Sequence, residues 1–237
     1  MNFEEQIQKA TNLIKHAKKV VVLTGAGIST PSGIPDFRSA GSGLWKKFNP
    51  MEVASIGAFH QNPNRFYEWV RPLVQKILDA KPNSAHIALA ELESKGYIDA
   101  VITQNIDNLH QVAGSKNVLE VHGHIREINC AIDGSIPKCS KCGSGSLKPN
   151  VVLFGEMLPA QVMIEAEKAV DEADLILVAG SSLEVSPISE MPHRVVLHGK
   201  KIIVVNLQDT YIGSKADVVI QRNVVDVLPK IAEFMRR

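Results

Sequence analysis

The run Val20-Val21-Val22-Leu23, followed at once by Thr24-Gly25-Ala26-Gly27, decides the fold of this chain. A short, unbroken stretch of β-branched and apolar residues is typical of a parallel strand that is covered on both faces. The glycines after it favour a tight turn where the backbone can approach a pyrophosphate, and a helix after that turn would direct free N–H groups at the charge. The dinucleotide fingerprint is incomplete, because Thr30 stands where a third glycine is usual.

The same texture recurs along the chain. Further apolar runs are Ala100-Val101-Ile102, Leu175-Ile176-Leu177-Val178 and Ile202-Ile203-Val204-Val205. Helical patterns alternate with them, at residues 3–17, 84–95, 160–172 and 226–236. Ser84 is the expected N-cap of the second helix. Strands and helices in alternation predict an α/β fold with a doubly wound parallel sheet.

Two stretches break this alternation. Residues 39–80 contain six of the twelve Phe, Tyr and Trp residues and are interpreted as a helical insertion. Residues 129–150 hold all three cysteines among Gly, Ser, Lys and Pro, and read as a small excursion with little core of its own.

Length and charge bound the function. The chain has 237 residues, of which 45% are hydrophobic, enough for one large domain with a small appendage. Its 26 Lys and Arg balance 25 Asp and Glu, so direct nucleic-acid binding is not expected. Residues 1–20 are too charged for a signal peptide, and no apolar run approaches the length of a membrane span. We therefore predict a cytoplasmic protein that does not bind membranes.

Polar residues gather where the predicted strands end. The second strand runs into Thr103-Gln104-Asn105-Ile106-Asp107, with His122 shortly after, and a loop after the first strand carries Asp36-Phe37-Arg38. Ligands of open α/β sheets bind at the carboxyl ends of the strands, where side chains point into a crevice. We therefore expect chemistry at this edge.

Six motifs, in this order along the chain, resemble those of the sirtuin family of NAD-dependent protein deacylases. They are Gly25-Ala26-Gly27-Ile28-Ser29, Pro35-Asp36-Phe37-Arg38, Thr103-Gln104-Asn105-Ile106-Asp107, His122-Gly123, Phe154-Gly155-Glu156 and Gly180-Ser181-Ser182-Leu183. The resemblance implies a Rossmann-like NAD-binding domain of residues 1–38, 81–128 and 151–237. It also implies a small module with a helical part, 39–80, and a zinc-ribbon-like part, 129–150. NAD and an acyl-lysine peptide would then meet in the cleft between them.

The resemblance implies a set of NAD contacts. Asn105 and Asp107 would satisfy the nicotinamide carboxamide with the Ile106 backbone between them, although an Asx-type turn explains any one such residue equally well. Phe37 would keep water from the ribose, while Asp36 and Arg38 order the loop. The whole predicted set is Gly25, Ala26, Gly27, Asp36, Phe37, Arg38, Gln104, Asn105, Ile106, Asp107, Gly180, Ser181, Ser182 and Asn206.

His122 is the predicted general base, because it matches the family's catalytic position and a histidine titrates near pH 6.5. It would take a proton from a ribose hydroxyl. The other histidines considered, His60, His86, His110 and His193, are assigned structural roles. Ser181 as a hydrolase nucleophile is disfavoured, because the chain has no Gly-x-Ser-x-Gly elbow around it.

The predicted peptide site consists of two segments between which the substrate would add as an extended strand. Its residues are Val152, Phe154, Gly155, Glu156, Leu183 and Glu184. Family members that prefer acidic acyl groups carry Tyr and Arg three residues apart in the helical module. Here Tyr67 has Val70 at that spacing, with Arg71 one further, so we expect acetyl to be preferred over succinyl.

The cysteines depart from the family pattern of two Cys-x-x-Cys pairs. Cys139 and Cys142 form one pair, but Cys130 has Asp133 in place of its partner. Asp133 or water would complete a weakened zinc site. The alternative is a lost site with reduced thiols or an adventitious disulfide.

The resemblance implies an NAD-dependent protein-lysine deacetylase, a transferase that yields nicotinamide, free lysine and O-acetyl-ADP-ribose. The alternative is an NAD- or ADP-ribose-binding module, or an ADP-ribosyltransferase, with weakened peptide deacylation. A hydride-transferring dehydrogenase ranks third, because no substrate-polarising His and Arg pair is evident.

Overall fold

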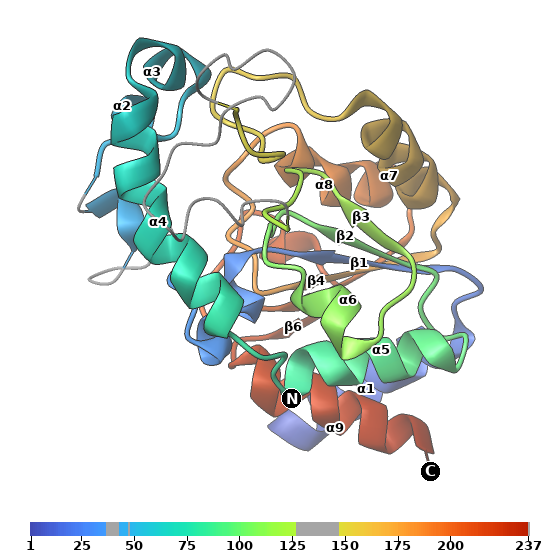
Figure 1. The fold of residues 1–237 in the computed structure, drawn as a ribbon. Helices are drawn as coiled ribbons and strands as arrows, with labels where there is room; N and C mark the ends of the chain where they lie inside the picture. Colours follow the sequence, from blue (N-terminus) through green and yellow to red (C-terminus); the bar gives the residue numbers. More distant parts are fainter. Residues whose placement is uncertain (37–42, 47, 127–146, 237) are drawn as a thin grey trace.

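The computed structural model describes residues 1–36, 43–46, 48–126 and 147–236 of the chain. Within these residues, six parallel strands form one sheet in the order β3-β2-β1-β4-β5-β6 (Figure 1). The strands are β1 (Val20–Thr24), β2 (Ala100–Thr103), β3 (Val118–Glu120), β4 (Leu175–Ala179), β5 (Lys201–Val205) and β6 (Val218–Ile220). The predicted doubly wound sheet is confirmed, and its order reverses between β1 and β4, which opens a crevice at that point.

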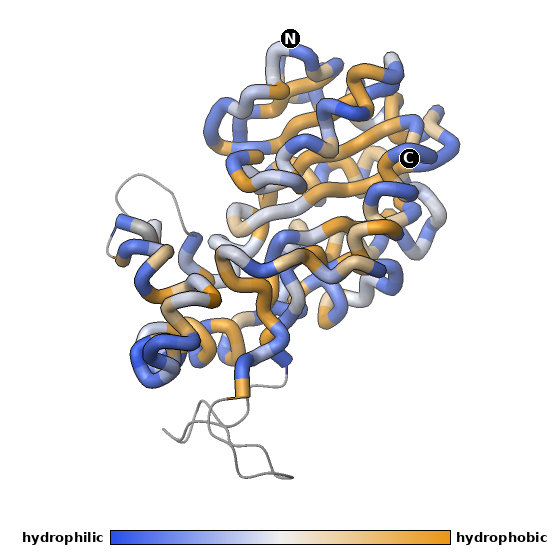
Figure 2. Tube along the Cα trace, turned by 90° about the horizontal axis from the view of Figure 1, so that it is seen from above, coloured by the Kyte–Doolittle hydropathy of each residue, from blue (hydrophilic) through white to orange (hydrophobic). Residues whose placement is uncertain are grey.

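Helices cover both faces of the sheet. One layer consists of α1 (Phe3–His16), α5 (Ser84–Ser94) and α9 (Val224–Arg236), and the other of α7 (Ala160–Glu172) and α8 (Met191–Leu197), while the short α6 (Leu109–Ala113) follows β2 (Figure 1). Alternate residues of β1 divide between the two cores, with Val20 and Val22 facing the first layer and Val21 and Leu23 the second. Figure 2 shows the resulting hydrophobic interior, with hydrophilic segments around it. None of the described helices combines the length and apolarity needed to cross a membrane.

Several local predictions need correction. The second helix is capped by Asn83 and not by Ser84, because the Asn83 side chain accepts the Ala85 N–H at 2.9 Å. In place of the helix expected after the glycine turn, residues 26–32 form two 3-10 turns, Ala26–Ile28 and Thr30–Ser32. The short strands β3 and β6 were not predicted, since three residues are too few to give a periodic signal.

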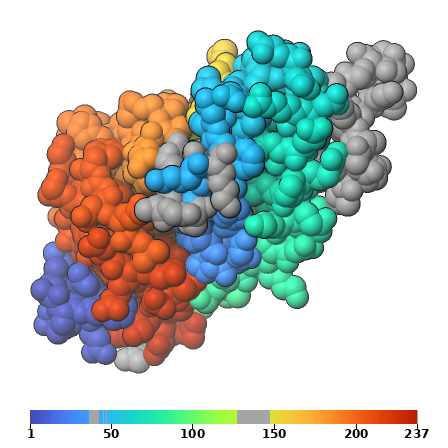
Figure 3. All heavy atoms as spheres, turned by 90° about the vertical axis from the view of Figure 1, so that its left-hand side faces the viewer, coloured from blue at the N-terminus to red at the C-terminus, as the bar shows by residue number. Residues whose placement is uncertain are grey.

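The predicted helical insertion forms α2 (Pro50–Val53), α3 (Ile56–Gln61) and α4 (Pro63–Asp79), which stand to one side of the sheet (Figures 1 and 3). A separate hydrophobic cluster holds them there. Phe59, Phe66 and Tyr67 contact one another edge to face within it, and Leu109 and Ile125 join it from the body around the sheet. One side of α4 therefore faces the carboxyl edge of the strands.

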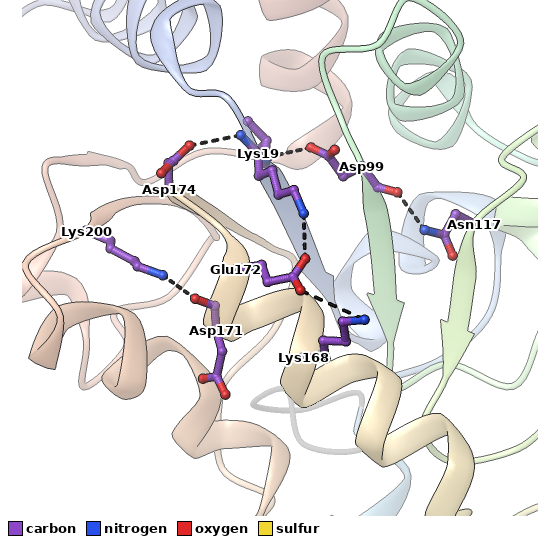
Figure 4. Close-up of polar contacts among 9 residues, drawn as sticks. Lys19, Asp99, Asn117, Lys168, Asp171, Glu172, Asp174 and Lys200 are labelled. Carbon is purple, nitrogen blue, oxygen red and sulfur yellow. Dashed lines mark hydrogen bonds and ion pairs between the residues drawn. The ribbon is translucent and has the colours of Figure 1, made fainter.

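The amino edge of the sheet is closed by carboxylates (Figure 4). Asp99, which precedes β2, accepts the Val20 N–H at 2.7 Å. Asp174, which precedes β4, accepts the N–H groups of Lys18 and Lys19 at 3.0 and 3.1 Å. Asp217, before β6, accepts the Ile202 N–H at 3.0 Å. Each acid thus satisfies a backbone donor at or just before the start of a neighbouring strand, where no ladder partner is available.

Candidate active site

A cleft of about 430 Å³ opens at the carboxyl edge, between the loops after the strands and the facing side of α4. In Figure 3 the helical insertion stands beside the body that contains β4 to β6. The register brings the loops to one level, because Thr24 pairs with both Thr103 and Ala179, and Ala179 pairs with Val205. The residues that follow these strand ends therefore lie along one edge and line the cleft.

The loops after β1 and β4 touch through two glycines. The Gly27 N–H donates to the Gly180 carbonyl at 2.8 Å. A Cβ on Gly27 would lie 2.8 Å from that carbonyl oxygen, and one on Gly180, whose φ is +63°, would lie 2.4 Å from the Ile28 nitrogen. Only glycines permit this approach. The pair fixes the floor of the crevice where the strand order reverses.

Beside this floor lies a buried polar cluster. The Ser29 hydroxyl donates to Asp107 Oδ2 at 2.6 Å, and Asn105 Nδ2 donates to Ser29 Oγ at 3.0 Å and to the Gly25 carbonyl at 3.1 Å. The other carboxylate oxygen of Asp107 accepts the Leu109 N–H at 2.9 Å. Ser29 is 1% exposed and Asp107 8%. The cluster thus holds an amide and a carboxylate side by side with little water.

Burial controls the charges in this cluster. Desolvation raises the pKa of Asp107 against the opposing effect of the hydrogen bonds from Ser29 and Leu109. Desolvation also lowers the pKa of His86 to about 4, so this ring is neutral at pH 7. His86 Nδ1 accepts the Asn83 N–H at 3.3 Å, which leaves the proton on Nε2, 3.4 Å from Ser29 Oγ. The donors therefore point from His86 through Ser29 to Asp107.

A second buried histidine, His110, lies beside the carboxyl ends of β1 and β2. His110 Nε2 is 3.0 Å from Thr24 Oγ1, which donates to Thr103 Oγ1 at 2.9 Å. Burial lowers the pKa of His110 to about 3. The structural roles predicted for His86 and His110 agree with these positions, since both rings are buried and pack edge to face, with centroids 4.9 Å apart.

His122 lies on the cleft wall with a defined tautomer. Its Nδ1 is 3.0 Å from the Gln104 carbonyl, and because a carbonyl only accepts, Nδ1 must carry the proton. In the neutral ring, Nε2 then holds the lone pair. The Gln104 side chain donates to Ser181 Oγ at 2.9 Å, so the backbone that orients His122 is tied to the loop after β4. This arrangement suits a general base.

Residues 151–156 form the wall next to His122. The Val152 N–H donates to the His122 carbonyl at 2.9 Å, and Phe154 exchanges backbone hydrogen bonds with Ala54 and Ile56. The segment thus bridges the sheet edge and the helical insertion. A Cβ on Gly123 would lie 2.0 Å from the Asn150 carbonyl oxygen, so only a glycine after His122 lets this backbone pack so closely.

Comparisons with known proteins agree with this geometry. Residues 25–187 match the model of the Sir2 family. NAD-dependent protein deacylase 2 of Archaeoglobus fulgidus is 45% identical, over 99% of this chain and 98% of the relative. NAD-dependent protein deacetylase 2 of Caldanaerobacter subterraneus is 44% identical, over 100% and 98%. This chain belongs to the Sir2 family.

Solved structures support the same assignment. One Sir2 enzyme structure, 44% identical, covers 99% of each chain with a TM-score of 0.92. Another, described as Sir2 with a p53 peptide and NAD+, is 40% identical, covers 96% of this chain and 98% of the other, and gives a TM-score of 0.87. The sirtuin resemblance seen in the sequence is thereby confirmed.

The structure brings most of the residues predicted for a Sir2 site to the cleft. The lining includes His122 and the predicted cofactor residues Gly25, Ala26, Gly27, Asp36, Gln104, Asn105, Ile106, Asp107, Gly180, Ser181, Ser182 and Asn206, together with Val152, Phe154, Gly155 and Glu156 of the peptide set. Leu183 and Glu184 are not in the lining, and Leu183 is 4% exposed and packs in the core. Phe37, Arg38 and the predicted zinc ligands Cys130, Asp133, Cys139 and Cys142 lie outside the described residues.

Sequence reasoning missed three parts of this Sir2 site. Ser29 was quoted as part of a motif but was given no role, although it holds both Asn105 and Asp107. The apolar side of α4 lines the cleft with Phe66, Trp69, Val70, Leu73 and Ile77, a helical spacing that was available as a signal. Arg222, which follows β6, also lines the cleft, and no sequence signal marked it.

Proposed function

We propose that this Sir2-family protein is an NAD-dependent protein-lysine deacetylase that yields nicotinamide, free lysine and O-acetyl-ADP-ribose. NAD, when bound, supplies the nicotinamide–ribose bond whose cleavage lets the ribose accept the acyl group. One observation carries the proposal: a single cleft joins Asn105 and the buried Asp107, both hydrogen-bonded to Ser29, to His122, whose Nε2 holds a lone pair.

The residues of the cleft fit a dinucleotide. Dinucleotides bind across the point where the strand order reverses, with the pyrophosphate at the turn after the first strand. Here that turn is the glycine contact between the β1 and β4 loops. The nicotinamide half would then lie toward β2, where Asp107 can accept a carboxamide N–H. Such a donor would stabilise the ionised carboxylate that burial disfavours.

His122 would move the proton. With Nδ1–H held by the Gln104 carbonyl, Nε2 can take a proton from a ribose hydroxyl. The Gln104 side chain and Ser181 keep this carbonyl in place. The ring thus needs no reorientation before it acts.

The peptide partner would be an acetyl-lysine segment that lies along residues 152–156. This wall is held by backbone bonds to both His122 and the helical insertion, so it is a rigid edge for an added strand. A solved relative described as Sir2 with a p53 peptide and NAD+ supports this partner class. The roles of Leu183 and Glu184 in peptide binding remain predictions.

The helical insertion supports acetyl over succinyl as the acyl group. Tyr67 is 1% exposed, its hydroxyl donates to the Leu147 carbonyl, and neither Tyr67 nor Arg71 is among the described residues that line the cleft. Val70 does line it and is apolar. None of the described α4 residues that line the cleft is a cation that could pair with an acidic acyl group.

One assay tests the proposed function. Purified protein is incubated with NAD and matched acetyl-, succinyl- and unmodified-lysine peptides, and the products are identified by mass spectrometry. We expect deacetylated peptide and O-acetyl-ADP-ribose in equal amounts. Binding of NAD without any deacylation, or transfer of ADP-ribose to the peptide, would favour the alternative of a binding module or ADP-ribosyltransferase.

The zinc site, the domain boundaries and the cytoplasmic location also remain proposals. We propose that Cys130, Cys139 and Cys142 bind zinc weakly, with Asp133 or water as the fourth ligand. Zinc stoichiometry and chelator sensitivity would be compared between the parent and Asp133→Cys, which should bind more tightly. Metal-free protein that is fully active and unaffected by the substitution would show that these residues hold no zinc.

A further inference from the structure

Arg222 stands at the end of the cleft furthest along the sheet from β2. It follows β6 and lines the cleft together with Asn206, Leu207 and Gln208 after β5 and Asn223 and Val224 at the start of α9. These five neighbours are uncharged. No carboxylate is therefore present among the described lining residues at this end, and Arg222 is a lone cation there.

The Arg222 guanidinium rests on an aromatic ring. Its central carbon lies 4.4 Å from the Phe3 ring centroid, and Lys230 Nζ lies 4.7 Å from the same centroid. Among the described residues, neither cation forms an ion pair with a carboxylate. Two like charges on one ring repel each other, and an anion beside them would relieve the repulsion.

The position of this pair relates it to the dinucleotide of the proposed function, on which the inference rests. Because the proposed function puts nicotinamide at Asp107, toward β2, and the pyrophosphate at the β1 and β4 loops, the adenosine half would extend the other way, toward β5 and β6. In Rossmann folds an acidic residue at the adenosine ribose selects NAD, whereas a nearby arginine accommodates a 2′-phosphate. The described residues that line this end of the cleft include the arginine and no acid.

We propose that the cleft also binds 2′-phosphorylated dinucleotides, NADP and NADPH, with the phosphate paired to Arg222. Stacking on Phe3 engages the flat face of the guanidinium, and the proposed pairing with phosphate uses its N–H edge. NADP and NADPH then compete with NAD for the site and inhibit deacetylation. Lys230, which does not line the cleft, adds positive potential without direct contact.

Calorimetry with ADP-ribose and ADP-ribose 2′-phosphate tests the pairing without any reaction. We expect the parent to bind the 2′-phosphate at least as tightly as ADP-ribose. Arg222→Ala should weaken binding of the 2′-phosphate about tenfold or more and that of ADP-ribose less than about twofold. Lys230→Ala is the matched control, since it removes an equal charge from the same ring, and should weaken the 2′-phosphate by less than about threefold.

Several outcomes would overturn the pairing. If Arg222→Ala and Lys230→Ala lose equal affinity for ADP-ribose 2′-phosphate, the phosphate is attracted only by the general positive potential and is not paired with Arg222. An unchanged affinity in Arg222→Ala would refute the pairing. If adenosine 3′,5′-bisphosphate binds as tightly as adenosine 2′,5′-bisphosphate, the site attracts anions without specificity for the 2′-phosphate. If ADP-ribose itself fails to bind, the proposed function fails, whereas binding of ADP-ribose with rejection of the 2′-phosphate rejects only this inference.

Discussion

The amino and carboxyl edges of the sheet use polar residues in opposite ways. At the amino edge, Asp99, Asp174 and Asp217 accept backbone N–H groups near the start of neighbouring strands, and none of the three is fully buried. At the carboxyl edge, Ser29 and Asp107 are buried in a cluster that lines a cleft. The carboxylates of the amino edge satisfy backbone donors while they remain in contact with water. The carboxyl edge instead keeps a carboxylate away from water.

The pKa values of two aspartates express this difference. For Asp217, burial is outweighed by the hydrogen bonds from Lys201 and the Ile202 N–H, so its pKa is lowered. For Asp107, burial prevails and the pKa is raised. Ionised Asp217 therefore stabilises the fold, whereas ionised Asp107 costs stability. A buried carboxylate that lowers stability and lines a cleft suggests a functional role. We therefore propose that Asp107 binds nicotinamide.

The largest expected effect is on the chemistry of the carboxyl edge. His122→Ala should reduce deacetylation about a thousandfold, because it removes the general base, while NAD still binds. The matched amino-edge variant, Asp174→Ala, should keep full turnover. Steady-state rates and NAD titrations of both variants provide the measurement. Turnover of His122→Ala within a few-fold of the parent would remove this residue from the proposed role.

Asp107→Asn separates function from stability at the buried cluster. The change keeps the shape of the side chain but removes the charge, so nicotinamide exchange and deacetylation should both fall, by about a hundredfold. The free energy of unfolding at pH 7 should change little, because removing a desolvated carboxylate offsets the loss of one of the two acceptors used by Ser29 and the Leu109 N–H. Normal exchange combined with failed deacetylation would place Asp107 outside the nicotinamide pocket.

Acid should loosen the carboxyl edge before the amino edge. The pKa values of His86 and His110 are lowered to about 4 and about 3 from 6.5, so the unfolded chain binds more protons below pH 6.5. Stability is complete above that pH and is lost as the pH falls, by about 2 kcal/mol per ring at pH 5. Urea unfolding of His86→Gln between pH 7.5 and 5 should show a shallower loss than the parent. The exposed His198→Gln should keep the parent slope, and equal slopes for all three would contradict the assignment.

A smaller effect is expected at the amino edge itself. Asp217→Ala should lower the free energy of unfolding by about 1 kcal/mol, because the Ile202 N–H loses its acceptor. Asp217→Asn keeps an acceptor and should lose less. The contribution of Asp217 is present above pH 4 and disappears as the pH falls below 3.8, the opposite sign to Asp107. A changed deacetylation rate in either variant would contradict the view that the amino edge contributes to stability alone.

The smallest effect concerns the surface ion pair of Lys19 and Glu172, also at the amino edge (Figure 4). Both side chains are about half exposed, at 49% and 44%. Glu172→Gln should therefore leave the melting temperature and the turnover unchanged. A clear drop in melting temperature would show that the amino edge depends on its charge pairs as well as on its backbone caps.

Sequence patterns predicted the larger elements because those elements repeat a local signal. The buried runs at residues 20–23 and 175–178 are apolar throughout, which a parallel sheet requires, and helix 160–172 was predicted at its observed bounds. The strands β3 and β6 could not be predicted, because each is only three residues long. Asn117 precedes β3 and donates to the Asp99 carbonyl, and Asp217 precedes β6 and accepts the Ile202 N–H. These hydrogen bonds exist only once the neighbouring strand is in place, so the sequence could not reveal them.

The sequence alone was enough to predict the doubly wound sheet, the family and most of the cofactor residues that line the cleft, because strand and helix periods and motif order are properties of the chain itself. It did not reveal the roles of Ser29, of the apolar side of α4 or of Arg222. Tertiary structure decided what depends on distance between segments. It placed Gly180 against Gly27, fixed the tautomer of His122 through the Gln104 carbonyl, and buried Ser29 on Asp107. It also placed Arg222 at the end of the cleft beyond β5, beside described lining residues that are all uncharged.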